Sequence, residues 1–281
     1  MRRLTIICAV LAFVAVSVSG VTVEAVRGKV NDGYNFWLYK PDNAACDSVR
    51  KPLVLFLHGA SLCGGDLSRV KRYGTIDAIE RGRTLDAYVV APQNPGGAWR
   101  PKRLMNVIDW VMDRFPVDTN RVYVIGMSLG GYGTIDMVAT YPDRIAAAMA
   151  FCGGGTVKDL SRLNEVPLWI VHGTADRAVT VQQSDKVVSA MKDHDADTPR
   201  LIYHRVPGMD HGQPARLFYL QESYDWLFSH SLDDPDRTVN EGFDPASSEV
   251  MRNAYKGLKN THKHKKSSKR KRRSGSKAKR K

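Results

Sequence analysis

The stretch that most constrains this chain is residues 121–133. A β-branched apolar run leads into a Gly-x-Ser-x-Gly pattern centred on Ser128, and helical spacing follows. This order is typical of a nucleophile elbow, a strand-to-helix turn that exposes a serine Oγ. Gly126 and Gly130 are expected because a Cβ at either position would collide with the neighbouring strand or helix. A glycine-rich turn with an unreactive serine is the alternative.

The basic charge of the chain is concentrated in its last residues. The 281 residues carry a net charge of +13, and 15 of the 42 Lys and Arg lie within residues 250–281, which contain no Asp or Glu. The other 249 residues therefore hold 27 basic and 29 acidic side chains. The body is nearly neutral, so the basic pI describes the tail and not the site.

The amino-terminal residues predict an export signal. Arg2 and Arg3 precede an apolar segment, residues 4–18, which is short for a membrane span and followed by small residues. We expect a signal peptide over residues 1–20, ending at the latest near residue 25, and a secreted or periplasmic protein. An uncleaved anchor is the alternative.

Three cysteines follow the expected signal: Cys46, Cys63 and Cys152. Export permits disulfides, and Cys46 and Cys63 flank the first buried strand, which makes them a plausible pair. Three cysteines leave at least one thiol free. Their spacing suggests no zinc site, so we expect no metal.

The chain alternates buried strands and helices, which favours a mostly parallel, doubly wound α/β sheet. Residues 33–40 read as an edge strand. The other strands are expected at residues 52–57, 87–92, 121–125, 145–151, 166–171 and 200–206. Helices are expected at about residues 67–80, 102–115, 133–139, 181–191 and 215–228. We expect one catalytic domain over residues 26–232.

Three residues in strand-end loops form a candidate catalytic triad. Ser128, Asp176 and His211 occur in the order that serine elbows on such sheets present. His211 would take the Ser128 proton and pass it to the leaving group, while Asp176 would orient the imidazole. Asp176 as a helix N-cap is the alternative.

Other acids and histidines compete for these roles. Asp159 and Asp185 are weaker candidates for the acid. His204 falls inside an expected strand, and His58 and His172 lie against glycines at strand ends, where a histidine more often braces a loop.

Two backbone amides should form the oxyanion hole. One is that of Leu129, directly after the nucleophile. The other belongs to the loop after the first buried strand, where Ala60 is our candidate, with Ser61 behind it. Gly59 lets that backbone turn toward the substrate.

Short motifs then connect the chain to a known group. They are Leu57-His58-Gly59, Ala91-Pro92-Gln93, the elbow, Tyr141-Pro142-Asp143-Arg144, His172-Gly173-Thr174-Ala175-Asp176 and Asp210-His211-Gly212. Over about residues 30–230 the chain resembles the α/β-hydrolase superfamily. Within it the chain is most similar to small secreted esterases related to feruloyl and acetylxylan esterases, to polyhydroxybutyrate depolymerases and to prolyl-oligopeptidase-like hydrolases. The loop after Gly59 departs from the Gly-Glu-rich form common in the last group.

The resemblance implies an α/β-hydrolase fold and a serine hydrolase that works without a metal or organic cofactor. No long insertion interrupts the pattern, so we expect no lid domain and an open cleft. That cleft suits small or polysaccharide-borne esters. Trp99 is a candidate for lining the substrate groove, with packing in the core as the equal alternative.

Residues 233–281 are expected to be a linker followed by a disordered Lys/Arg-rich tail. Residues 253–281 contain one aromatic, Tyr255, and few aliphatics, too little apolar surface to offset ordering entropy. Such a tail attracts polyanions or anionic surfaces without reading sequence. No obligate protein partner is implied.

These observations favour a secreted carboxylic ester hydrolase that acts through an acyl-enzyme. Two alternatives are a serine peptidase that uses the same triad and an inactive hydrolase-fold protein that binds polyanions through its tail.

Overall fold

A computed structural model describes residues 22–41, 49–239, 242–244, 246 and 248–260. The strands are β1 (Thr22–Val26), β2 (Phe36–Lys40), β3 (Lys51–Leu57), β4 (Tyr88–Pro92), β5 (Val117–Met127), β6 (Ala147–Phe151), β7 (Leu168–Gly173) and β8 (Leu201–Val206). The α-helices are α1 (Thr75–Glu80), α2 (Pro101–Met112), α3 (Leu129–Thr140), α4 (Gln182–His194), α5 (Gln221–Phe228) and α6 (Ser248–Arg252). Short 3₁₀ helices are η1 (Ala60–Leu62), η2 (Leu67–Arg72), η3 (Pro142–Arg144), η4 (Ser161–Glu165) and η5 (Gln213–Tyr219).

The eight strands form one sheet in the order β1-β2-β4-β3-β5-β6-β7-β8. Strands β4, β3, β5, β6, β7 and β8 pair in parallel, whereas β2 pairs antiparallel with β1 and β4. The sheet is therefore mostly parallel, as the alternation of strands and helices predicts. The carboxyl ends of β3, β5, β7 and β8 lie along one edge of the sheet, which gathers the loops that follow them.

The position of the outermost strand differs from the sequence prediction. β2 was expected at the edge, but β1 pairs outside it over five residues, from Thr22↔Lys40 to Val26↔Phe36. Thr22 and Ala25 of β1 are exposed, its two middle residues are half-buried and only Val26 is buried. Its stability comes from backbone pairing, which leaves little hydrophobic signal in the sequence.

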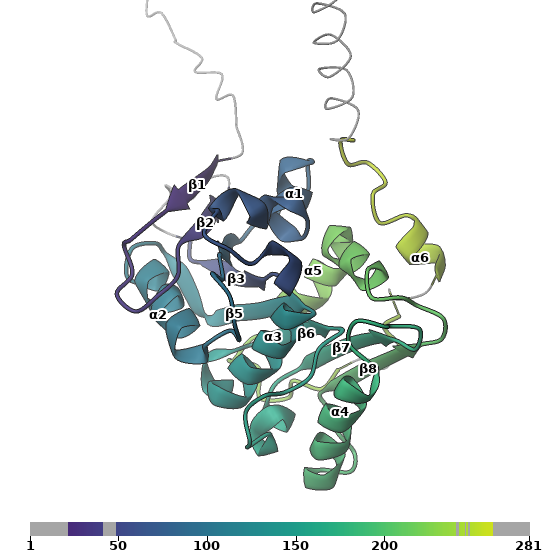
Figure 1. Ribbon diagram of the computed structural model, residues 1–281. Helices are drawn as coiled ribbons and strands as arrows, with labels where there is room; N and C mark the ends of the chain where they lie inside the picture. The colour runs from purple at the N-terminus through teal and green to yellow at the C-terminus, as the bar shows by residue number, and fades with distance from the viewer. Residues whose placement is uncertain (1–21, 42–48, 240–241, 245, 247, 261–281) are drawn as a thin grey trace, which may run out of the picture.

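Each face of the sheet buries its own hydrophobic cluster. Alternate residues of β3 divide between them, with Val54 and Phe56 on one face and Leu53, Leu55 and Leu57 on the other. Helices α2, α3 and α4 cover the face of the leucines, and α1, α5 and α6 cover the face of Phe56 (Figure 1).

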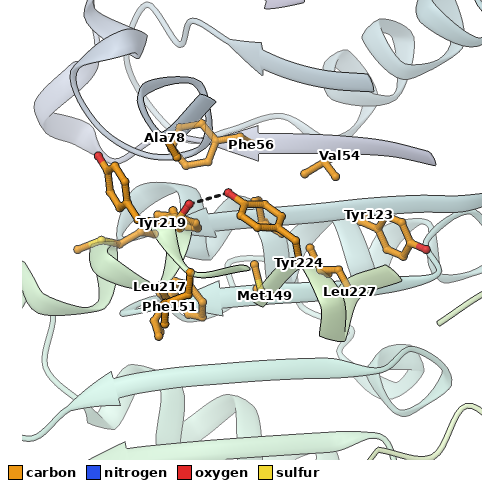
Figure 2. Close-up of a cluster of buried hydrophobic side chains, with 14 of the residues drawn as sticks. Val54, Phe56, Ala78, Tyr123, Met149, Phe151, Leu217, Tyr219, Tyr224 and Leu227 are labelled. Carbon is orange, nitrogen blue, oxygen red and sulfur yellow. Dashed lines mark hydrogen bonds between the residues drawn. The ribbon is translucent and has the colours of Figure 1, made fainter. Parts of the chain in front are cut away.

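Several large aromatic side chains, among them Phe151 and Tyr224, lie in the cluster around Phe56 (Figure 2). The fully buried Tyr224 donates a hydrogen bond of 2.7 Å to the carbonyl of Phe218, and Phe56 packs edge-on against Phe218 with centroids 5.1 Å apart. These contacts fix η5 and α5 against β3.

The helix expected over residues 67–80 is interrupted in its middle. Helix η2 ends at Arg72, Tyr73 is extended, and α1 begins after Gly74, whose φ is +89°. A Cβ at Gly74 would lie 2.0 Å from the Phe56 ring. Glycine is therefore required both for the conformation and for the close approach to the core.

The packed chain continues beyond residue 232, where the sequence analysis placed the start of the linker. Ala246, Met251 and Ala254 are buried in the same cluster as Phe56, and Phe243 packs against Trp169 with centroids 4.9 Å apart. We call the described residues 242–244, 246 and 248–260 the C-terminal strap. Its apolar residues are few and widely spaced, so they form no periodic pattern from which a packed segment could be predicted.

Several sequence expectations lie outside the described residues, namely the signal peptide, Cys46 and the basic tail after residue 260. Cys63 and Cys152 carry free thiols. Within the described part of the chain, no helix has the length and apolar character needed to cross a membrane.

A shortened chain tests the strap. A protein that ends at Asn260 should melt at the same temperature as the full chain. One that ends at Leu232 should melt lower by about 10 °C or more, because it loses several buried apolar side chains. Thermal unfolding by circular dichroism measures both, and equal melting temperatures would show that the strap does not stabilise the body.

Candidate functional site

Ser128 stands at a sharp turn between β5 and α3. Its φ of 59° and ψ of −122° are strained for a residue with a side chain. A Cβ at Gly130 would lie 1.9 Å from the Leu57 carbonyl oxygen, and one at Gly126 would lie 2.3 Å from the Gly130 carbonyl oxygen. The expected need for both glycines is confirmed, and the turn holds Ser128 at the carboxyl edge of the sheet.

The structure brings the three candidate triad residues together. His211 Nε2 lies 3.0 Å from Ser128 Oγ, and His211 Nδ1 lies 2.6 Å from Asp176 Oδ2. The side chain of Asp176 is fully buried and that of His211 is 28 % exposed. A proton on Nδ1 facing the carboxylate leaves Nε2 free to accept the serine proton.

Asp176 is held in its ionised form by its partners. Burial alone raises the pKa of its carboxyl group, but hydrogen bonds from His211 and from the amides of Val179 and Ala178 outweigh burial and hold the pKa below its usual value. Each of these two amides donates a hydrogen bond of 2.9 Å to Asp176 Oδ1. Asp176 does not cap α4, whose N-cap is Val181.

The competing histidines have structural partners. His58 is buried, and its Nε2 accepts the Asn94 amide hydrogen at 3.1 Å, so Nδ1 carries the proton and donates to the Gly59 carbonyl. His172 Nε2 lies 2.9 Å from the Val179 carbonyl oxygen. Both brace loops, as their positions beside glycines predict.

The competing acids are also engaged elsewhere. Asp185 accepts hydrogen bonds from Tyr203 and Arg205, and Asp159 accepts one from the amide of Ser161.

The two candidate oxyanion donors lie beside Ser128. Leu129 is the first residue of α3 and Ala60 the first of η1, and the amides of first helical residues have no partner within the helix. Both residues line a cavity of about 630 Å³ that also contains Ser128 and His211.

The walls of this cavity are mostly apolar. They are formed by Gly59, Ala60, Ser61, Tyr73, Met127, Ser128, Leu129, Tyr132, Ala178, Val179, His211, Gly212 and Ala215. No Asp, Glu, Lys or Arg is among these lining residues, so the cavity suits an uncharged group.

Trp99 does not line the cavity. It is only 3 % exposed, and its indole N–H donates to the His58 carbonyl at 3.2 Å. A Cβ on Gly133 would lie 2.8 Å from the Trp99 side chain. The substrate-groove prediction for Trp99 is corrected here to a packing role, because Gly133 opens a slot in α3 that the indole fills.

Sequence reasoning missed Tyr73 and Tyr132, the two tyrosines of the cavity wall. Tyr73 was missed because the sequence predicts one continuous helix over residues 67–80, in which this side chain has no special position. Tyr132 lies in the first turn of α3, one helical turn after Ser128, and its position after the elbow is a signal that could have found it.

Cys152 lies close to Asp176 and His211, and no motif in the sequence predicts this. Donor atoms of Cys152, Asp176 and His211 lie within 4.8 Å of one another. Burial, and then the Asp176 charge, raise the pKa of the Cys152 thiol and keep it protonated. Both nitrogens of His211 already have partners, so the group offers no free metal-binding set.

Comparisons with known proteins show that the chain is similar to hydrolases and esterases. Residues 100–216 match the Dienelactone hydrolase family. Acetylxylan esterase A of Emericella nidulans is 24 % identical over 231 residues, which cover 73 % of this chain and 71 % of that protein. The bifunctional acetylxylan esterase/xylanase XynS20E of Neocallimastix patriciarum is 28 % identical over 181 residues, 61 % of this chain but 26 % of that protein.

Among solved structures, a thermostable esterase superimposes with a TM-score of 0.60 at 26 % identity. The match covers 75 % of this chain and 63 % of that one. The fold is thus shared with known esterases beyond the region of the family match.

The buried His58 predicts a pH-dependent stability. Burial, with a smaller effect of the Arg69 charge, lowers its pKa from 6.5 to about 4. Between these values the unfolded chain binds a proton that the folded chain does not, so the free energy of unfolding should fall as the pH drops, by up to about 3 kcal/mol.

Urea unfolding at several pH values, compared with a His58→Gln variant, measures this effect. The variant should lose less stability than the wild type between pH 6.5 and 4. Parallel curves for the two proteins would show that His58 is not the group responsible.

Proposed function

We propose that this chain is a serine esterase of the α/β-hydrolase superfamily that acts through Ser128, His211 and Asp176. The observation that carries the proposal is the continuous hydrogen-bonded line from the Asp176 carboxylate through His211 to Ser128 Oγ. The relatives named as esterases and the match to the Dienelactone hydrolase family support it.

The proposed reaction has two halves. In the first, His211 Nε2 takes the Ser128 proton while Oγ attacks the ester carbonyl carbon, and the amides of Leu129 and Ala60 stabilise the oxyanion. The C–O bond to the alcohol then breaks, and His211 gives its proton to the departing alkoxide. In the second half, water gives a proton to His211 and attacks the acyl carbon. The bond between that carbon and Ser128 Oγ then breaks, and His211 returns the proton to Oγ, which releases the acid and free Ser128.

The proposed substrates are neutral esters, including acyl groups carried on polysaccharides. The relatives named acetylxylan esterases support the polysaccharide. The apolar walls and the volume of about 630 Å³ leave room for an acyl group larger than acetyl. Cleavage of peptide bonds in preference to esters by the purified enzyme would contradict this assignment.

We further propose that the protein is exported, on the strength of the basic and then apolar residues 1–18. Amino-terminal sequencing of the protein recovered outside the cytoplasm should begin between residues 21 and 26. Recovery of the full-length chain in the cytoplasm only would contradict export.

Two substitutions test the catalytic roles. Ser128→Ala should reduce kcat on p-nitrophenyl acetate to the background rate, because no nucleophile remains. Asp176→Asn should lower kcat by about 10⁴-fold, because an amide favours the wrong tautomer of His211.

An Asp185→Asn variant is the matched control, since Asp185 is a carboxylate outside the triad. It should keep nearly wild-type turnover. Substantial hydrolysis by a folded Ser128→Ala protein would exclude this mechanism.

A further inference from the structure

We infer that Tyr73, together with Arg69, is a positioning residue that fixes the oxyanion loop, residues 59–64, in its active geometry. This inference rests on the proposed esterase function. It adds two side chains that neither belong to the triad nor lie in the loop.

Tyr73 reaches the loop directly beside the nucleophile. Its hydroxyl accepts the Gly59 amide hydrogen at 2.7 Å. The point that a Cβ on Gly59 would occupy is 3.0 Å from the Tyr73 hydroxyl and 3.3 Å from Ser128 Cβ. The phenol therefore approaches Gly59 from the same side as Ser128, and Tyr73 lines the same cavity.

The hydroxyl stays protonated while it accepts this hydrogen bond. Burial raises the pKa of Tyr73, and the hydrogen bond from the Gly59 amide partly offsets that rise. The phenol is therefore neutral at neutral pH.

Side chains from outside the loop also donate hydrogen bonds to its carbonyl groups. Arg69 Nη2 donates to the Ser61 carbonyl at 2.9 Å. Gln93 Nε2 donates to the Leu62 carbonyl at 2.8 Å and to the Gly64 carbonyl at 2.9 Å. Carbonyl oxygens that are held by these groups cannot turn toward a developing negative charge.

Most backbone amides of the loop already donate a hydrogen bond, and two do not. Those of Leu62, Cys63 and Gly64 donate to backbone carbonyls, and that of Gly59 donates to Tyr73. Within the described chain, the amides of Ala60 and Ser61 have no protein acceptor. Two residues of the cavity wall thus keep unpaired amides in a loop that is already fixed. Donors that need no reorganisation during the reaction are the ones that stabilise an oxyanion.

The core sets the position of Tyr73. The Tyr73 ring packs edge-on against Phe56 with centroids 6.2 Å apart. The Gly74 amide donates to the Tyr219 hydroxyl at 3.3 Å. The break between η2 and α1 is thus the feature that turns the phenol toward Gly59.

Tyr73→Phe keeps the ring and removes only the hydroxyl. We expect kcat to fall by about 10- to 100-fold, because a small displacement of the oxyanion amides is costly, while KM stays within about twofold. The inhibition constant of a phenylboronic acid, which forms a tetrahedral adduct with the serine, should rise by a similar factor. A merely structural role would not couple these two changes.

Tyr123→Phe is the matched control, because it removes a buried hydroxyl that donates to the His230 carbonyl. It should leave kcat and boronate inhibition unchanged. Arg69→Gln is a second variant that leaves the core intact, and it should lower kcat several-fold with little change in KM.

The outcomes separate this inference from the proposed function. An active wild type with unchanged kcat in both Tyr73→Phe and Arg69→Gln would overturn the positioning role alone. Equal losses in Tyr73→Phe and Tyr123→Phe that follow the melting temperature would also overturn it. A wild type with no turnover on any ester would contradict the proposed function, and with it this inference.

Discussion

The contact on which the site depends is the close approach of α3 to the end of β3. A side chain at Gly130 would overlap the Leu57 carbonyl, so only glycine lets the helix begin directly against the strand. That approach forces Ser128 into its strained conformation. It also brings the Leu129 amide beside the loop that follows β3. One backbone contact thus places the nucleophile next to the oxyanion loop.

The acid and the base are connected by a second backbone contact, between the loops after β7 and β8. The Ala175 amide donates to the Met209 carbonyl at 3.1 Å, and a Cβ on Gly173 would lie 2.0 Å from that same oxygen. Glycine again allows the approach. His211 therefore reaches Asp176 and Ser128 from a loop whose backbone is fixed, and little ordering is left for substrate binding to supply.

Much of this arrangement was predictable from the sequence because it depends on local signals. Continuous apolar runs identified most of the parallel strands, and glycines in the loops of Ser128, Asp176 and His211 marked the segments that bring these residues together. The features that were missed depend on contacts between distant segments. Trp99 is buried because Gly133 makes room for it, and Tyr73 leaves its helical register because of a contact that Gly74 makes with the core. No window of sequence contains both partners of such a contact.

The central claim is that His211 activates Ser128 for attack. The most direct measurement is the rate of labelling by a fluorophosphonate, with the modified peptide identified by mass spectrometry, in the wild type and in a His211→Gln variant. The account predicts rapid labelling at Ser128 in the wild type and labelling slowed by several orders of magnitude in the folded variant. Equal labelling rates in the two proteins, or modification at a residue other than Ser128, would contradict it.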